Sequence, residues 1–431
     1  MKLTDVKIDS DTGIFYGWKI AFVSLLVTTT GFGVLYSFGV FFKIWIKEWN
    51  CSRAFLSGAF SSAFLVYGIS SFFMGKLSDR IGPRKTIAYG GLIMGFGSIL
   101  TAMVNEAWVL YITFGLMIGI GVGTSYAPTV STVSRWFIEK KGIAVGIVVA
   151  GLGAGSLVYS PLARTFITLT DWRSTFIFFG IIIWIVYFST AWTIRRHPFD
   201  LGMKPYGMLN LKKADPYIGN MTKHPKSKQG DSGISTLYAL KKPVFWNLFF
   251  VHCLWVVGMT IPMVHLVPYA TDRGIPPEHA ATMLALVGGF SIAGRLTLGQ
   301  IAEKMGMKNA LLLLLFMQSI AMVWLAAGKV NWMLWGFSFF FGMTYGGLAS
   351  IFPLITEQYF GLIELGSIFG LILLGATLGG VTGPIVAGYL FDLTQSYNYG
   401  IYFGAGSMAV GVFLSLLLPT NTSQTASTLF P

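Results

Sequence analysis

The chain has 431 residues, of which 54% are hydrophobic and 11% are charged, and its mean hydropathy is +0.67. A soluble domain carries about 25% charged residues, so this composition excludes a soluble protein and favours one that resides in a lipid bilayer. The net charge of +13 would suit nucleic acid, but the basic residues lie in short segments between apolar runs, which is typical of membrane proteins. We therefore expect no nucleic-acid partner.

Apolar runs of about 20 residues recur along the chain, and each is long enough to cross a bilayer as a helix. The first run lacks a small-residue cleavage site, which predicts a retained span and not a signal peptide. The sequence thus predicts an all-α membrane protein with twelve transmembrane helices. We expect these helices at residues 19–43, 55–75, 85–103, 107–133, 142–163, 174–194, 244–268, 280–300, 309–327, 332–356, 366–389 and 397–418.

Residues 195–242 form the one long polar stretch and are interpreted as a cytoplasmic linker. It separates a predicted N-terminal six-helix bundle, residues 1–194, from a C-terminal six-helix bundle, residues 243–431. With both termini inside, the cytoplasmic segments hold 22 of the 30 Lys and Arg residues and the outer loops hold seven. Because Lys and Arg are enriched on the cytoplasmic side, we expect a multi-pass protein of the cell (inner) membrane with both termini in the cytoplasm.

A cluster of residues occurs twice, at a separation of 224 positions, as from Gly75 to Gly299. The same offset relates further Gly and Trp residues of the two halves without a gap. Repeated halves in a membrane protein indicate a transporter whose site lies between them, so we expect the bundles to be pseudo-symmetric. The two copies are Gly75, Asp79, Arg80, Gly82 and Arg84, and Gly299, Glu303, Lys304, Gly306 and Lys308.

Each copy of this cluster falls at a short loop between two predicted helices. Its glycines permit a tight turn and close helix approach, and an acid at a helix end can pair with a neighbour's basic groups or N-terminus. The pattern predicts a cytoplasmic latch, and a plain charged turn is the alternative. The latch residues are Gly75, Asp79, Arg80, Gly82 and Arg84 in the first half and Glu303 and Lys304 in the second.

Arg295 is the one Lys or Arg in the interior of a predicted span, away from its ends, where an arginine costs about 2.5–3.5 kcal/mol unless it meets a partner or water. Ser291 precedes it by one turn on the same helical face. The spans have no Asp or Glu in their middles, so the guanidinium suits an external carboxylate, bound through two parallel hydrogen bonds. A single cation favours a small monoanion. The alternative is a side chain that reaches toward the cytoplasm, near Gln300 and Glu303.

Four helices that the repeat makes equivalent should border a central cavity. They carry tyrosines, which offer an apolar face and a hydroxyl group, and a histidine able to carry a proton near neutral pH. Ordinary packing is the alternative for each tyrosine, and a structural role is the alternative for the histidine. The predicted lining is Tyr36, Tyr126, Tyr345 and His265, with Leu35 and Leu152 as an apolar wall.

The loop from Gly75 to Lys85 resembles the signature of the major facilitator superfamily. Over nearly the full chain, the sequence also resembles prokaryotic monocarboxylate transporters, in the branch that holds the oxalate–formate antiporter. This resemblance implies that Arg295 binds the substrate carboxylate and that Leu35, Tyr126, Leu152 and Tyr345 border the site. The motifs that carry it are Tyr16-Gly17-Trp18, Tyr36 to Phe42, Trp49 to Arg53, Pro198 to Gly202, Pro205 to Gly207 and His265 to Ala270.

The chain departs from that family at three places. Animal members place an aspartate where this chain has Ser291, and a lysine where it has Gly39-Val40, so their proton relay cannot be transferred. The oxalate antiporter uses a second cation on helix 11, and the segment from Leu371 to Gly383 has none, which argues against oxalate.

The sequence therefore predicts a secondary active transporter of a small monocarboxylate such as lactate, pyruvate or acetate. We expect alternating access with proton symport, so that the substrate, a proton and the lipid bilayer are its partners. Anion exchange of the oxalate–formate type, or carriage of another small solute, is the alternative. Because no nucleophile, acid–base pair or metal cluster stands out, we expect no enzymatic activity, cofactor or metal.

Overall fold

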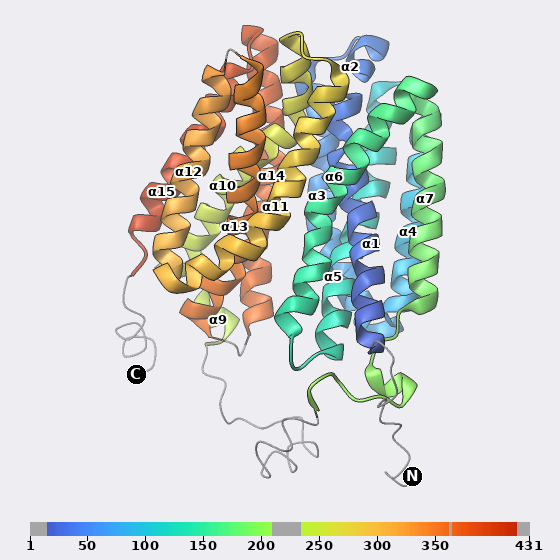
Figure 1. Ribbon diagram of the computed structural model, residues 1–431, viewed down its shortest axis with the longest axis vertical. Coiled ribbons are helices and arrows are strands. Elements are labelled where there is room, and N and C mark those ends of the chain that lie inside the picture. Colours follow the sequence, from blue (N-terminus) through green and yellow to red (C-terminus); the bar gives the residue numbers. More distant parts are fainter. Residues whose placement is uncertain (1–14, 209–233, 329, 362–363, 420–431) are drawn as a thin grey trace.

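The computed structural model describes residues 15–208, 234–328, 330–361 and 364–419. Within these ranges the chain is almost entirely helical, and the one β-type pairing joins Phe137 to Tyr206. The long helices run roughly along one common direction and form two groups that lie side by side (Figure 1). This arrangement confirms the predicted all-α fold of two six-helix bundles.

Six helical spans form each bundle in the described part of the chain. The first bundle contains α1 (Tyr16–Tyr36) continued by α2 (Phe38–Trp49), α3 (Arg53–Ile81), α4 (Pro83–Ala102), η1 (Ala107–Val109) and η2 (Tyr111–Ile118) continued by α5 (Gly119–Trp136), α6 (Lys141–Leu169) and α7 (Trp172–Thr193). The second contains α10 (Pro243–Asp272), α11 (Pro277–Met305), α12 (Met307–Ala327), α13 (Asn331–Phe360), α14 (Leu365–Thr394) and α15 (Asn398–Leu416). The short helices η3 (Pro198–Leu201) and α9 (Thr236–Ala239) lie between them in sequence.

Every predicted span has a helix at its position, and most helices extend a few residues beyond the predicted ends. Eleven spans in the described ranges are long and apolar enough to cross a membrane. The twelfth, α4, has 20 residues, and Arg84 and Lys85 in its first turn lower its hydropathy together with its glycine, serine and threonine residues. The helices are longer than the apolar runs because a helix can continue for a polar turn outside the hydrocarbon layer and keep its backbone hydrogen bonds. Hydropathy does not detect such polar turns.

The internal repeat is visible in the packing. Helix α1 packs on α6 as α10 packs on α14, α3 packs on α5 as α11 packs on α13, and α4 packs on α7 as α12 packs on α15. Gly82 and Gly306, which the 224-residue offset relates, both have positive φ, at 89° and 87°. Only glycine adopts this conformation readily, so both halves use the same tight turn between consecutive helices.

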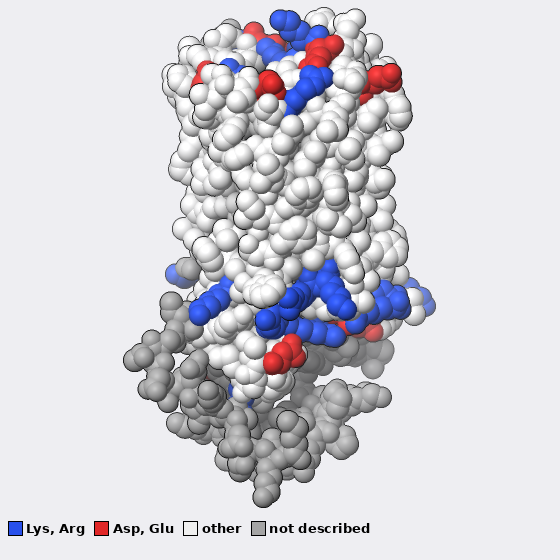
Figure 2. Space-filling model, turned by 90° about the vertical axis from the view of Figure 1, so that its right-hand side faces the viewer, with Lys and Arg blue, Asp and Glu red and all other residues white. Residues whose placement is uncertain are grey.

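We call the end of the molecule at which α7 ends and α10 begins the linker end, and the opposite end the far end. The start of α1 and the end of α15 also lie at the linker end (Figure 1). Figure 2 shows a broad band without charged side chains, with mostly Lys and Arg at its linker-end rim and both signs of charge at the far end. This banding is what a bilayer-spanning protein requires.

The predicted linker is described only in part, since residues 209–233 lie outside the described residues. Before this gap, the backbone N–H of Tyr206 donates to the carbonyl of Trp136 at 2.9 Å. After it, the N–H of Ile234 donates to the carbonyl of Phe360 at 3.1 Å. Both described sections therefore pack against the bundle that adjoins them in sequence.

Candidate substrate site between the two bundles

Three pairs of helices join the bundles: α6 with α11, α3 with α14, and α2 with α10. Glycines allow the closest approaches. A Cβ atom added to Gly153 of α6 would lie 2.5 Å from the Gly288 carbonyl oxygen of α11, and Gly68 of α3 lies against Thr377 of α14. Small residues at such crossings bring helix backbones together, so the bundles touch at mid-helix.

The bundles part between these contacts and the linker end. Gly146 and Gly142, which come next along α6, and Gly370 of α14 have no atom within 4 Å of the place where a Cβ would lie. Arg295 lies one turn beyond Ser291 on this side, about 15 Å from the linker end of α11. The guanidinium therefore lies where the gap between α6 and α11 begins, deep within the membrane-spanning band.

Arg295 uses only one edge of its guanidinium for hydrogen bonds within the described protein. Its Nη1 donates to the Ser291 hydroxyl at 3.2 Å, and that hydroxyl donates to the Gly288 carbonyl at 2.7 Å. Nε and Nη2, on the other edge, are buried and have no hydrogen-bond partner. The ion pairs among the described side chains do not include Arg295. A buried cation with a free two-donor edge is poorly satisfied until an anion binds.

The structure brings the predicted tyrosines to this guanidinium. The Cζ atom of Arg295 lies 5.3 Å from the centre of the Tyr345 ring on α13. The Tyr36 hydroxyl, at the end of α1, interacts with Tyr345, and both Tyr36 and Tyr126 of α5 lie within electrostatic range of Arg295. Tyr36 and Tyr345 are buried and Tyr126 is partly buried. Tyrosines from three helices thus lie near one cation.

Tyr67 on α3 belongs to the same cluster, and the sequence analysis missed it. It interacts electrostatically with Tyr126 and Tyr345, and its ring centre lies 5.3 Å from that of Phe32. One turn further along α3, the Ser71 hydroxyl is buried without a hydrogen-bond partner. The repeat offset maps Tyr67 onto Ser291 and Ser71 onto Arg295, so the signal that could have found Tyr67 was present in the sequence.

The two predicted leucines occupy different surroundings. Leu35 is fully buried in α1 beside Tyr36 in sequence. Leu152 is partly buried on α6, next to the glycine that touches α11. Their placement on α1 and α6 is compatible with an apolar wall on the first bundle's side of the gap.

The structure does not bring His265 together with Arg295. His265 lies seven residues before the far end of α10, whereas Arg295 lies 18 residues beyond the far end of α11, a difference of about 16 Å along the helix axes. Its Nε2 lies 3.0 Å from the Pro384 carbonyl oxygen and 3.3 Å from the Ser57 hydroxyl. The predicted substrate-lining role is therefore not supported by position, because its place on α10 puts it in the far-end contact between the bundles.

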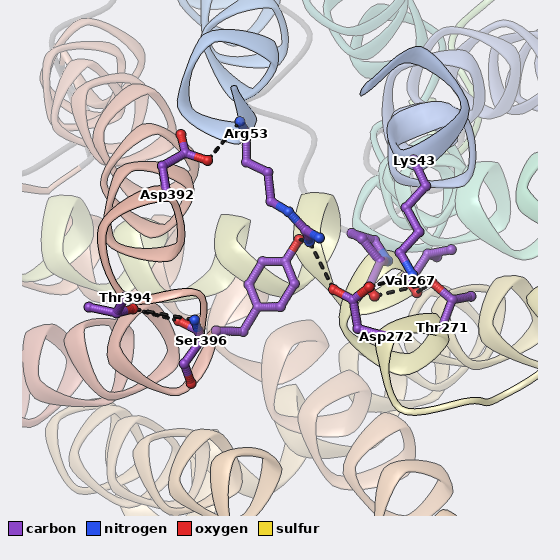
Figure 3. A network of polar contacts seen from close by, with 10 residues as sticks. Lys43, Arg53, Val267, Thr271, Asp272, Asp392, Thr394 and Ser396 are labelled. Carbon is purple, nitrogen blue, oxygen red and sulfur yellow. Dashed lines mark hydrogen bonds and ion pairs between the residues drawn. The ribbon is translucent and has the colours of Figure 1, made fainter. Parts of the chain in front are cut away.

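Charged residues link the bundles at the far end (Figure 3). Asp272 of α10 pairs with Lys43 of α2 at 2.5 Å and with Arg53 of α3 at 3.0 Å. The Asp392 carboxylate of α14 accepts hydrogen bonds from the backbone N–H groups of Arg53 and Ala54, at 3.0 and 2.8 Å. These contacts join α2 and α3 of the first bundle to α10 and α14 of the second.

Further contacts strengthen this far-end closure. The Arg53 guanidinium lies over the Phe391 ring at 3.7 Å and also hydrogen-bonds the Tyr397 hydroxyl. On the other side of the interface, Arg164 of α6 pairs with Glu278 of α11 at 2.8 Å. The bundles are therefore closed at the far end and separated at the linker end.

The predicted latch lies at the linker end. Asp79 pairs with Arg135 of α5 at 2.5 Å, and its carbonyl accepts a hydrogen bond from Arg196 at 2.6 Å. A Cβ atom added to Gly75 would lie 3.7 Å from the Ala127 side chain of α5, which is an ordinary contact, and the Arg84 guanidinium lies 5.2 Å from the Trp192 ring centre. All these partners belong to the first bundle or directly follow it, so the contacts hold that bundle together and do not join it to the second.

The remaining latch residues have no described partner that bears on this prediction. Arg80 and Lys304 are exposed at the linker end. The Glu303 side chain lies outside the described residues. A latch role for these three stays a prediction.

Comparison with known proteins supplies the family. The sequence matches the Major Facilitator Superfamily over residues 20–372. It is 26% identical to monocarboxylate transporter 11 of Homo sapiens, an alignment that covers 94% of this chain and 83% of that protein. Monocarboxylate transporter 13 of Bos taurus is 24% identical over 94% of this chain and 89% of its own length. Monocarboxylate transporter 3 of Gallus gallus is 26% identical, with 94% and 78% covered.

The fold has a solved counterpart. It is similar to the crystal structure of a bacterial homologue of the human lysosomal transporter Spinster, in an inward-facing and unoccupied conformation. The TM-score is 0.70 over 97% of this chain and 98% of that one, at 14% sequence identity, which supports the fold alone. The protein is thus a membrane transporter and not an enzyme; it belongs to the Major Facilitator Superfamily and is related to the monocarboxylate transporters.

Proposed function

We propose that this protein is a secondary active transporter of small monocarboxylates of the lactate, pyruvate or acetate type. The observation that carries the proposal is the free edge of Arg295. Nε–H and one Nη2–H point in parallel from the same side of the planar guanidinium, which is the spacing at which a carboxylate accepts two hydrogen bonds.

The surroundings of Arg295 favour a small, singly charged acid. Tyr36, Tyr126 and Tyr345 offer aromatic faces and hydroxyl donors for the remainder of such a molecule. No second Lys or Arg accompanies Arg295 in the described parts of the spans near mid-helix. A dicarboxylate such as oxalate would bring a second negative charge without a partner into a low-dielectric site, which is costly.

The arrangement of the bundles supports alternating access. The site opens toward the linker end, while ion pairs close the far end, and the two bundles are joined mainly by helix crossings that can rock. We infer that the linker end faces the cytoplasm, because Lys and Arg predominate there. The protein would then face inward in this structure.

Transport of labelled lactate into proteoliposomes tests the substrate and the coupling. Arg295→Lys keeps the positive charge but loses the two-donor edge. Because hydrogen bonds to charged groups contribute about 1.5–3 kcal/mol, we expect its initial uptake at subsaturating lactate to fall by about tenfold or more. Arg173→Lys is the matched control, since Arg173 pairs with Glu48 within the first bundle, and it should retain uptake.

The same vesicles separate symport from exchange. Proton symport predicts that acidifying the outside raises the initial rate of uptake several-fold. The alternative, exchange of the oxalate–formate type, predicts that preloading with a second carboxylate drives uptake without a pH gradient. Failure of wild-type protein to carry any monocarboxylate in either protocol would refute the proposed substrate class.

A further inference from the structure

A lateral groove runs between the two bundles on the lipid-facing side. It has a volume of about 360 Å³ and is lined by α3, by α10 with the residue that follows α9, and by α14. Ile69 of α3 and Leu374 and Leu378 of α14 are 47%, 45% and 52% exposed, so the groove opens sideways. It is distinct from the Arg295 site, none of whose residues lines it.

The lining of the groove offers nothing to a polar ligand. It is apolar except for Thr377 and Trp246, and both of these use their donors internally. The Thr377 hydroxyl donates to the Leu373 carbonyl at 3.1 Å, and the Trp246 Nε1 donates to the Leu240 carbonyl at 2.9 Å. Within a bilayer, a cavity of this kind fills with hydrocarbon and not with water.

The depth of the groove matches one leaflet. Its lining on α14 runs from Leu371 to Leu378, about 9 to 20 Å from the linker end of that helix. The hydrocarbon core of a bilayer is about 30 Å thick, so the acyl chain of the leaflet at the linker end spans this range. A lipid whose tail lies in the groove must place its headgroup at the linker-end surface.

Lysine residues lie at the linker end on both walls of the groove, near the position of that headgroup. Lys76 continues the α3 stripe of Leu65 and Ile69, since it follows Ile69 by two helical turns. Lys241 and Lys242 directly precede α10, one turn before Trp246 in the groove. The nearby Glu364 carboxylate already accepts a hydrogen bond from the Thr236 N–H at 2.6 Å. Three lysines next to an apolar groove are complementary to an anionic headgroup with an acyl tail.

We propose that this groove binds one acyl chain of an anionic phospholipid, with its phosphate held by Lys241, Lys242 and Lys76. The walls belong to different bundles, and they converge where Gly68 of α3 meets Thr377 of α14. A tail in this wedge holds the linker ends of α3 and α14 apart. The effect of the lipid on the two bundles rests on the proposed alternating access, whereas the binding of the lipid in the groove does not.

Native mass spectrometry of the full chain with phosphatidylglycerol or phosphatidylcholine tests the site. Each lysine near a headgroup contributes about a fivefold change in affinity, so the double variant Lys241→Gln/Lys242→Gln should bind phosphatidylglycerol about tenfold or more weakly. Leu374→Trp, which fills the groove, should lower the number of tightly bound phosphatidylglycerol molecules by one. Both variants should keep the Tm of the wild type in detergent to within a few degrees, which establishes that they fold.

Matched controls separate the groove from the general surface. Lys140→Gln/Lys141→Gln removes an adjacent lysine pair at the linker end of α6, and Leu313→Trp enlarges an exposed side chain on α12. Neither should change the tightest phosphatidylglycerol binding. Equal affinity of the wild type for both lipids, or equal losses in the test and control variants, would overturn the site.

The conformational effect is measured separately. Spin labels at positions 81 and 367, on the linker ends of α3 and α14, should report a longer distance in phosphatidylglycerol nanodiscs than in phosphatidylcholine nanodiscs. The difference should vanish in Leu374→Trp. Identical distances in the two lipids would overturn the wedge. Because neither measurement uses a carboxylate, a failure of the proposed substrate class would leave both results unaffected.

Discussion

At the scale of single residues, the substrate proposal depends on which hydrogen-bond donors are used and which are free. The Ser291 hydroxyl holds one edge of the Arg295 guanidinium and thereby fixes the direction of the other. Tyr345 lies beside the Arg295 guanidinium, and Tyr67, on α3 of the other bundle, interacts electrostatically with Tyr345. A carboxylate that enters this space would lose its hydrogen bonds to water. It would gain two charge-assisted hydrogen bonds to Arg295 and contacts with the tyrosine rings.

Tyr67→Phe tests whether the residue that sequence reasoning missed contributes to binding. The change keeps the ring and removes the hydroxyl, so the loss of one hydrogen bond to the substrate should raise the KM for lactate by about three- to tenfold. The control is Tyr187→Phe, because the Tyr187 hydroxyl donates to the Gly121 carbonyl at 3.2 Å inside the first bundle. That control should lower the Tm and leave the KM unchanged. An unaltered KM for Tyr67→Phe would exclude its hydroxyl from the site.

At the scale of elements, two kinds of contact hold the bundles together: helix crossings at mid-helix and ion pairs at the far end. The crossings at Gly153 and Gly68 are close-packed, because a Cβ atom added at either glycine would overlap the opposing helix. The pairs of Asp272 with Lys43 and Arg53 are partly exposed, and each contributes about 0–1 kcal/mol. Such weak pairs suit a closure that must open during each transport cycle.

Asp272→Asn should shift the conformational equilibrium toward a form that is open at the far end. Losing both partly exposed pairs costs about 1 kcal/mol, which corresponds to roughly a fivefold change in the ratio of the two forms. Spin labels at positions 169 and 279, on the far ends of α6 and α11, measure the populations. Glu48→Gln is the control, because its ion pair with Arg173 lies within one bundle at the same end. A shift of the same size in both variants would contradict the assignment of Asp272 to the closure.

At the scale of the whole molecule, charge sets the orientation and the repeat sets the architecture. The uncharged band of Figure 2 separates a basic rim from a rim of mixed sign. The start of α1 and the end of α15 lie at the end of the molecule that carries the basic rim (Figures 1 and 2). The two bundles repeat the same pairings of helices, so their architecture is pseudo-symmetric. The site between them is asymmetric, because it has a single arginine.

Labelling with a membrane-impermeant maleimide tests the proposed orientation in intact cells of a Cys51→Ser background. A cysteine in place of Leu169, which is exposed at the far end, should react from outside. A cysteine in place of Ile138, which is exposed at the linker end, should react only after permeabilisation. The reverse pattern would place the linker end outside and would refute cytoplasmic termini.

The sequence by itself determined the positions of the helices, the internal repeat and the presence of one cation, Arg295, within a span that has no acidic partner. Hydropathy and turn residues are local, so each of the twelve spans was found to within a few residues at most ends. The offset of Gly82 to Gly306 anticipated the shared turn, and the position of Arg295 in a span without acids anticipated its unpartnered edge. These properties depend on neighbours along the chain and need no knowledge of how helices face one another.

Only the tertiary structure decided which faces meet. In a membrane, helices are apolar on the lipid side and on the bundle side, so periodicity does not reveal the rotation of a helix about its axis. The repeat offset identifies Tyr67 as the counterpart of Ser291, but helix rotation and depth along the membrane decide that Tyr67 lies beside the site and that His265 lies in the far-end closure. They likewise pair Lys43 with Asp272 across 229 positions of sequence and leave the lateral groove between α3 and α14. Such contacts arise from packing between distant segments, which no local pattern in the chain encodes.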